Sequence, residues 1–224
     1  MENSNQPLSK KPLRIDIVSD VVCPWCIIGY RQLAEALKQT NTEHEIHWHP
    51  FELNSNMPSA GQNLREHIME KYGSSKEESD ASRLRMTQAG NEVGFEFNFN
   101  DDTRMHNTFN LHQLLYWAGQ QGQKPMHDLK QALFGAHFTY GRNISDNTVL
   151  ADIAAEVGLN REEALAVLED QRFSKEVRAE ERYWQQQGIQ SVPAMIFNER
   201  HLVSGAQGVD NYVNILQQLA AMQE

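Results

Sequence analysis

The sequence predicts an α/β fold, and three observations carry this prediction. Near the start of the chain, apolar and polar residues alternate and then change to a helical period at a pair of closely spaced cysteines. A long stretch of helical pattern follows, and the chain closes with two short strand-like segments and a helix. A period of two is typical of strands and a period of 3.6 is typical of helices, so the pattern indicates the order of the elements.

The first unit is predicted to be a strand, a helix and a second strand. Leu13–Ser19 alternates, and Val18 interrupts its polar face, which is typical of a strand buried on both sides. A helix is predicted from Pro24, because proline fits a first helical turn. Its apolar stripe is Ile27, Tyr30, Leu33, Ala34 and Leu37. Glu45–His49 predicts the second strand, which Pro50 ends, and a strand–helix–strand unit favours a parallel pair.

Helical patterns dominate residues 54–171, and glycines lie where the helices are expected to end. The predicted helices are Leu64–Tyr72, Lys76–Ala89, Met105–Gln120, Met126–Thr139, Thr148–Val157 and Arg161–Gln171. Asn160 and Glu163 predict a capping box at the start of the last of these helices. One extended segment, Phe95–Phe99, interrupts the block.

The last unit is predicted to be a helix, a β-hairpin and a final helix. The first helix carries Phe173, Val177, Glu180 and Trp184 and closes at Gly188. The strands Val192–Phe197 and His201–Ser204 flank a turn at residues 198–200, and therefore predict a hairpin. The final helix buries Tyr212, Val213, Leu216 and Leu219.

This order of elements is that of a thioredoxin fold interrupted by an all-helical insertion domain. We expect a disordered tail over residues 1–12, a thioredoxin-like domain formed by residues 13–53 and 172–224, and an insertion domain over residues 54–171. The 224 residues and 40% hydrophobic content are sufficient for a core of this size.

The composition argues against several functional classes. The net charge of −10 would repel phosphate backbones, so we expect no nucleic-acid partner. No apolar stretch approaches the length of a membrane span, and Met1–Pro12 does not resemble a secretory signal. We therefore expect a cytoplasmic protein, monomeric or homodimeric. In that compartment a close cysteine pair is more often catalytic or metal-binding than structural.

Cys23-Pro24-Trp25-Cys26 lies where the predicted strand passes into the helix. Unpaired N–H groups and the helix dipole favour a negative charge there, so Cys23 is predicted to ionise easily and to attack disulfides. Cys26 is three residues on, within disulfide reach, and is predicted to resolve the mixed disulfide. Pro24 and Trp25 would tune the potential of the pair and face the substrate.

Three other interpretations of the cysteine pair compete with redox chemistry. A zinc site needs about four ligands, and only His47 and His49 could join the cysteines, with nothing in the sequence to place them nearby. A buried structural pair without chemistry is the second interpretation, and a coincidental spacing of two cysteines is the third. The position between a strand and a helix favours redox chemistry, so we expect no metal and no bound cofactor.

Pro193 stands at the head of a predicted internal strand, where proline is unusual. An ordinary trans proline on an edge strand is the simpler interpretation by base rate. Together with the cysteine pair, however, Pro193 is expected to form a cis peptide bond beside the reactive centre. The backbone of Val192 would then be exposed for pairing with a substrate.

At this point the sequence resembles the DsbA family, in its FrnE-like branch. Ser19–Gly29 resembles the active-site stretch, Ser191–Ala194 the cis-proline loop, and Ser204–Gln207 the segment that opens the last helix. His106–Thr108 with His112, and Leu133–Phe138, resemble segments of the helical domain. The resemblance implies that the helical domain roofs the active site and that the protein oxidises, reduces or isomerises disulfides of proteins or small molecules.

The resemblance also implies an alternative function and further site residues. Kappa-class glutathione transferases and 2-hydroxychromene-2-carboxylate isomerases share the architecture but use serine at the position of Cys23. A glutathione-dependent isomerase or transferase is therefore the alternative, and glutathione is a possible co-substrate. Asn107 and His112 could face the pocket, and Gln207 lies where the glutathione-using relatives contact the tripeptide. Thioredoxins carry a buried acid at the position of Ile17, and here the nearest acids are Asp16 and Asp20.

Overall fold

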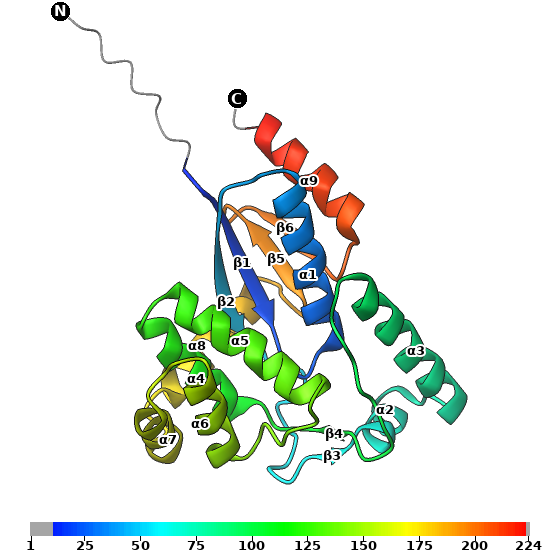
Figure 1. Cartoon of the computed structure of the whole chain (residues 1–224), viewed down its shortest axis with the longest axis vertical. Coiled ribbons are helices and arrows are strands. Elements are labelled where there is room, and N and C mark those ends of the chain that lie inside the picture. The colour runs from blue at the N-terminus through cyan, green and yellow to red at the C-terminus, as the bar shows by residue number, and fades with distance from the viewer. Residues whose placement is uncertain (1–10, 223–224) are drawn as a thin grey trace, which may run out of the picture.

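The computed structural model describes residues 11–222, and its centre is a four-stranded sheet of order β2-β1-β5-β6 (Figure 1). The strands are β1 (Leu13–Ser19), β2 (His44–Pro50), β5 (Ala194–Phe197) and β6 (His201–Ser204). β1 pairs parallel with β2 and antiparallel with β5, which in turn pairs antiparallel with β6. The predicted order of a parallel pair followed by an antiparallel hairpin is confirmed. Of the predicted tail over residues 1–12, residues 1–10 lie outside the described part of the chain.

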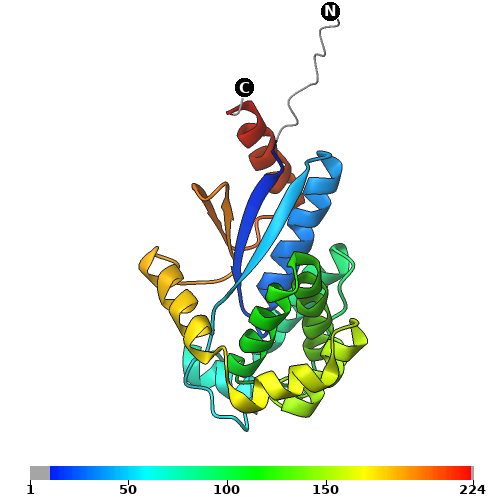
Figure 2. The same ribbon diagram turned by 90° about the vertical axis from the view of Figure 1, so that its left-hand side faces the viewer.

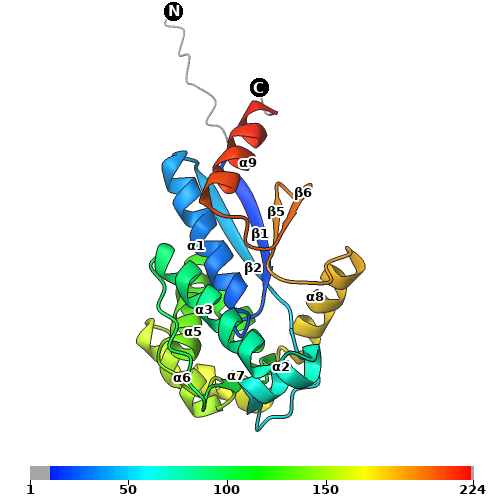
Figure 3. The ribbon, with the colours of Figure 1, turned by 90° about the vertical axis from the view of Figure 1, so that its right-hand side faces the viewer.

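Helices cover both faces of the sheet. Among them are α1 (Pro24–Gln39), α8 (Ser174–Gln186) and α9 (Val209–Ala221). Figures 2 and 3 show α1 on one face and α8 on the opposite face, and Figure 3 shows α9 beside α1. On the α1 side, Ile15 and Ile17 pack with Leu33 and Phe197, whereas Val18 belongs to a separate cluster that packs against α8. Burial on both faces therefore explains why Val18 interrupts the polar face of β1.

The insertion lies at the end of the sheet where β1 runs into α1 (Figure 1). Its helices are α2 (Leu64–Tyr72), α3 (Lys76–Glu92), α4 (Phe109–Gln120), α5 (Gln123–Phe138), α6 (Asn147–Glu156) and α7 (Arg161–Asp170). It also holds one short antiparallel pair, β3 (Gln62–Asn63) and β4 (Arg104–Met105). Within residues 11–222, no helix is both long and apolar enough to span a membrane.

Several predicted boundaries were wrong, for physical reasons that local pattern does not contain. The helix predicted from Met105 begins at Phe109, because Met105 pairs with Gln62 across the β3–β4 ladder. The helix predicted from Met126 begins at Gln123, since proline is accepted in its first turn. The strand predicted from Val192 begins at Ala194.

Phe95–Phe99 lies between helices without forming one, as predicted, and its rings pack on one another and on Phe138. One local motif differs from the prediction. The side chain of Asn160 accepts a hydrogen bond from Glu163 N, while the reciprocal capping box occurs at Ser75 and Glu78.

A buried network of charges joins β1, β2 and α8. The carboxylate of Asp16, 1% exposed, accepts from Arg14 Nη2 and lies 2.8 Å from His49 Nε2. The other ring nitrogen, His49 Nδ1, lies 2.5 Å from Glu180 Oε1. Burial opposes ionisation of Asp16, but the hydrogen bonds from His49 and Arg14 outweigh it and lower the pKa. Burial likewise opposes protonation of His49, but the bonds to Asp16 and Glu180 raise its pKa.

His49→Gln should lower the free energy of unfolding by about 1–3 kcal/mol near pH 5.5, because it removes the cation that Asp16 shares with Glu180 and leaves Asp16 with Arg14 alone. A raised histidine pKa contributes stability that is complete below its ordinary value of 6.5 and is lost as the pH rises through the folded-state pKa. The lowered pKa of Asp16 contributes stability only above its ordinary value of 3.8. The difference in the free energy of unfolding between wild type and His49→Gln should therefore be largest between pH 3.8 and pH 6.5. It should be smaller at pH 8.5.

Urea unfolding at pH 5.5 and 8.5 measures this difference. His44→Gln is the matched control, because His44 lies exposed on the same strand with its ring bonded to the Thr42 carbonyl. An equal loss of stability at both pH values would contradict the role assigned to His49.

Candidate active site

The two cysteines lie at the amino end of α1. Cys23 is the N-cap residue, with extended backbone angles (φ −93°, ψ 109°), and Pro24 is the first helical residue. Cys26 N donates to the carbonyl of Cys23 at 3.1 Å, so the pair spans one turn, and both are free thiols. Cys23 is 4% exposed and lines a cleft, whereas Cys26 is fully buried. Burial, together with a hydrogen bond to Cys23, raises the pKa of the Cys26 thiol well above its ordinary value.

The loop before β5 closes over this pair. The Val192–Pro193 peptide bond is cis, and the Val192 carbonyl accepts from Cys23 Sγ at 3.7 Å. Gly205 N donates to the Pro193 carbonyl at 2.8 Å, which joins this loop to the end of β6. Cys23 and Pro193 belong to elements that are far apart in the sequence, and the fold brings them together.

Gly29 allows this close approach, a role that was not predicted from the sequence. A Cβ at position 29 would lie 3.3 Å from Pro193 Cγ and 3.3 Å from Ala206 Cα. Both contacts are tighter than ordinary van der Waals distance, so a larger residue would push α1 away from the loop. The sequence did contain a signal for this close approach, because Gly29 lies inside a predicted helix, where alanine would otherwise be favoured.

A polar cluster is buried behind the cysteines. The Asp20 carboxylate accepts from Leu53 N at 2.7 Å and from Thr108 Oγ1 at 3.2 Å, and lies 3.2 Å from His112 Nε2. Burial opposes the charge on Asp20, but the hydrogen bond and charge of His112, the Leu53 N–H and the charge of Lys130 together outweigh it and lower the pKa. Lys130 of α5 also lies here, 1% exposed, and burial lowers its pKa to about 8. The insertion thus supplies three of the polar groups that surround the reactive turn.

A cleft of about 940 Å³ opens in front of Cys23. Of the residues predicted to bind substrate, Pro24, Trp25 and Val192 line this cleft, and Trp25 is 40% exposed. Its other walls come from α2, α3 and the segment after β2. The charged side chains among its lining are Glu52, Lys71, Glu78, Arg83 and Arg85.

The other three predicted substrate-binding residues lie away from this cleft. Asn107 Nδ2 donates to the Met57 carbonyl at 2.7 Å. His112 is buried against Asp20 and the Phe51 carbonyl, and so lies behind the cysteines rather than before them. Gln207 Nε2 donates to the Ser204 carbonyl at 2.6 Å in the turn that precedes α9.

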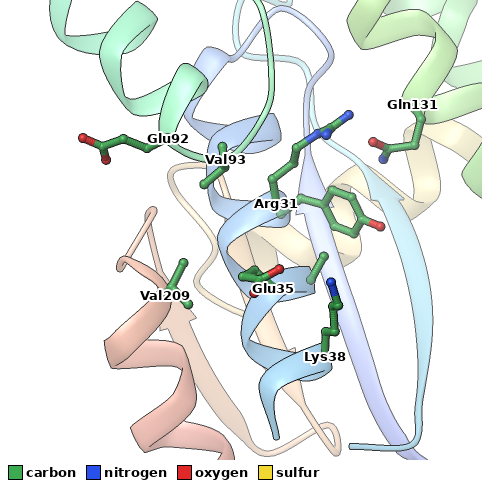
Figure 4. Close-up of a pocket in the computed structure, with 9 residues that line it drawn as sticks. Arg31, Glu35, Lys38, Glu92, Val93, Gln131 and Val209 are labelled. Atoms are coloured by element: carbon green, nitrogen blue, oxygen red, sulfur yellow. The ribbon is translucent and has the colours of Figure 1, made fainter. Parts of the chain in front are cut away.

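A second hollow, of about 420 Å³, lies farther along α1 (Figure 4). Its side chains come from α1, the end of α3, α5 and the start of α9, and neither cysteine is among them. Arg31 is held there by the Gly94 carbonyl and by the face of Phe95. Because it contains no thiol, this hollow is separate from the reactive centre.

The histidines considered as zinc ligands are held by protein groups. His49 contacts Asp16 and Glu180, and His47 Nδ1 accepts from Gln123 Nε2 at 3.0 Å. Over the part of the chain that the structure covers, no cluster of three or more His, Cys, Asp or Glu residues is arranged to hold a metal ion.

In the comparisons with known proteins, one family model covers most of the chain. The model of the DSBA-like thioredoxin domain family matches residues 14–217. A probable DsbA oxidoreductase of Streptomyces coelicolor is 30% identical, with 92% of this chain and 89% of that chain covered and a TM-score of 0.85. The uncharacterized protein YwbO of Bacillus subtilis is 27% identical over 204 residues, which are 88% of this chain and 92% of that protein.

A more distant structure shows the same fold. The cytosolic disulfide reductase DsbM of Pseudomonas aeruginosa, in a structure with GSH, superimposes with a TM-score of 0.62 at 15% identity. The match covers 93% of this chain and 99% of that chain. At this identity the likeness concerns the fold alone.

Gly29→Ala and Gly135→Ala should have opposite effects on stability. Alanine in a helix interior gains about 0.5–1 kcal/mol where there is room, and a Cβ at position 135 would meet only Tyr140, at 3.8 Å. At position 29 the crowding against Pro193 and Ala206 should cancel this gain and cost roughly 1 kcal/mol more. Thermal unfolding of both variants tests the contact, and an equal gain at the two positions would show that α1 and the loop are not tightly packed.

Proposed function

Because this chain belongs to the DSBA-like thioredoxin domain family, we propose that it is a thiol–disulfide oxidoreductase that works through Cys23 and Cys26. The observation that carries the proposal is the unequal placement of two free thiols one helical turn apart. Cys23 caps the helix and lines the cleft, while Cys26 is buried behind it. This placement supports Cys23 as the attacking residue and Cys26 as the resolving residue.

The proposed reaction has two exchange steps. Cys23 attacks a substrate disulfide as the thiolate and releases one substrate thiol. Cys26 then attacks Cys23 Sγ, forms the Cys23–Cys26 disulfide and releases the second thiol. Two electrons pass from the protein to the substrate, and the reverse sequence oxidises a dithiol.

We assign the cleft to the substrate. Its volume of about 940 Å³ suits a peptide segment or a small disulfide, with Trp25 as an exposed apolar contact. The Val192 carbonyl and Pro193 would position the substrate backbone beside the Cys23 sulfur, from which that carbonyl is 3.7 Å away. Glutathione is a candidate small co-substrate, because Lys71, Arg83 and Arg85 line the cleft and could meet its carboxylates. Assignment to the FrnE-like branch and to the cytoplasm stays a prediction.

Serine variants of the two cysteines separate the proposed roles. Cys23→Ser should abolish insulin reduction, because no thiolate then faces the cleft. Cys26→Ser should keep Cys23 reactive but accumulate a mixed disulfide that dithiothreitol reverses, since the resolving thiol is missing. Mass spectrometry after mixing with oxidised glutathione detects the trapped adduct, and circular dichroism confirms the fold of each variant.

Two outcomes would reject this function. Full insulin reduction by Cys23→Ser would show that Cys23 is not the nucleophile. Full activity of Cys26→Ala, with tight glutathione binding, would instead indicate a glutathione-dependent isomerase or transferase that needs one thiol.

A further inference from the structure

The hollow beside α1 lies where the inserted helices meet the thioredoxin-like part of the chain. Its walls come from α1 and the start of α9 on one side, and from the end of α3 and α5 on the other (Figure 4). A volume of about 420 Å³ is in the range of small-molecule sites, which often lie where separate parts of a fold meet. Ala34, Val93 and Val209 give these walls an apolar part.

A chain of hydrogen bonds behind the hollow fixes the direction in which the Tyr30 hydroxyl donates. Trp48 Nε1 donates to His127 Nδ1 at 3.1 Å, and His127 Nε2 lies 3.2 Å from the Tyr30 hydroxyl oxygen. Because an indole N–H can only donate, His127 Nδ1 accepts, and the ring proton lies on Nε2. His127 therefore donates to the Tyr30 oxygen. Across residues 11–222 this hydroxyl makes no other hydrogen bond, so its own proton is available to an acceptor in the hollow that Tyr30 lines.

Two further donors that line the hollow lack an acceptor. Arg31 Nε and Gln131 Nε2 are buried, and over the described part of the chain neither has a hydrogen-bond partner. Arg31 is anchored elsewhere, because its Nη1 donates to the Gly94 carbonyl at 3.2 Å and its guanidinium packs on the Phe95 ring. Figure 4 shows the side chains of Arg31 and Gln131 extending toward one another. An unsatisfied buried donor costs about 1–3 kcal/mol, which an acceptor placed between these two side chains would relieve.

The charges around the hollow favour an anionic ligand. Its cations are Arg31 and Lys38, and its acids are Glu35 and Glu92. Glu35 Oε1 already accepts from Gln39 Nε2 at 3.0 Å within α1. Figure 4 shows the Glu92 carboxylate directed away from Arg31 and Lys38. The guanidinium and the ammonium are therefore the charges that a ligand meets, and a carboxylate matches the edge of a guanidinium in both charge and shape.

We propose that this hollow binds a small organic carboxylate with an apolar body, at a site separate from the two cysteines. The carboxylate accepts hydrogen bonds from Arg31, Tyr30 and Gln131, and its apolar body packs against Ala34 and Val93. A neutral amide of the same shape loses the charge-assisted bond to the guanidinium, and an amine meets two like charges. Because the hollow contains no thiol, this inference does not depend on the proposed function.

Titration of the full chain with benzoate tests the proposal by NMR. The indole N–H signals of the four tryptophans are followed, and that of Trp48 is assigned with Trp48→Phe. Trp48 reports on the hollow because its indole is joined to Tyr30 through His127. Benzoate should shift the Trp48 signal with a saturable, roughly millimolar affinity. Benzamide and benzylamine, of the same size, should bind roughly tenfold or more weakly at the same ionic strength.

Variants of the lining residues locate the bound benzoate. Arg31→Met should weaken its affinity roughly tenfold or more, because methionine keeps the apolar stem and removes the charge. Tyr30→Phe and Gln131→Leu should each weaken it roughly two- to tenfold, since each removes one donor. Arg200→Met is the matched control, because Arg200 is exposed in the turn between β5 and β6, and it should leave the affinity unchanged. A loss of affinity in Arg85→Met but not in Arg31→Met would place benzoate in the cleft and overturn the proposal.

Thermal unfolding gives a measurement that depends on none of these variants. A ligand that binds only the folded chain raises the midpoint of unfolding as its concentration rises. Benzoate should raise the Tm of the wild-type chain more than benzamide does at the same concentration, and should do so equally in Cys23→Ser. Equal changes in Tm with benzoate and benzamide, or stronger binding of benzylamine than of benzoate, would overturn the proposal.

Discussion

The site depends on one constraint: the amino end of α1 must stay fixed at the end of a strand that is buried on both faces. β1 pairs with β2 and β5 and packs against helices on either side, so its last residue cannot move without opening the core. The four-residue connection from Asp20 to Cys23 is held by a hydrogen bond from Cys23 N to the Asp20 carbonyl. The orphan N–H groups of α1 therefore have a constant direction, and a sulfur anion at Cys23 can use them without rearrangement.

The insertion supplies the polar surroundings that the sheet lacks. β1 has Ile17 where thioredoxins carry a buried acid, so the strand offers no titratable side chain at that position. Thr108 and His112 of the insertion instead bond to Asp20, and Lys130 reaches the carbonyl that ends β1. The same insertion forms much of the cleft in front of Cys23. The thioredoxin-like part therefore positions the two sulfur atoms. The inserted helices supply the buried polar groups around Asp20 and form much of the cleft through which a substrate would reach Cys23.

The fold could be predicted further than the site. Hydrophobic period and the placement of proline and glycine are local, and they indicated the sheet order and the cysteine turn. The polar cluster depends on contacts such as that of His112 with Asp20, 92 positions apart, which no local pattern contains. The early start predicted for α4 failed for the same reason, since Met105 is taken by a partner 43 residues away in sequence. Asn107 and Gln207 looked available because their backbone partners, the carbonyls of Met57 and Ser204, are invisible in the sequence.

The proposed division of labour between the two cysteines follows from exposure. Both lie in one short turn, but only Cys23 lines the cleft, so a disulfide arriving from solvent meets that sulfur first. Burial keeps Cys26 as a thiol, which protects it from attack by other reagents and also makes it a poor nucleophile. A buried thiol can resolve a mixed disulfide only if a nearby group takes its proton, since bulk water does not reach it. The burial that supports a resolving role for Cys26 therefore also requires a proton acceptor within the protein, on the side away from the cleft.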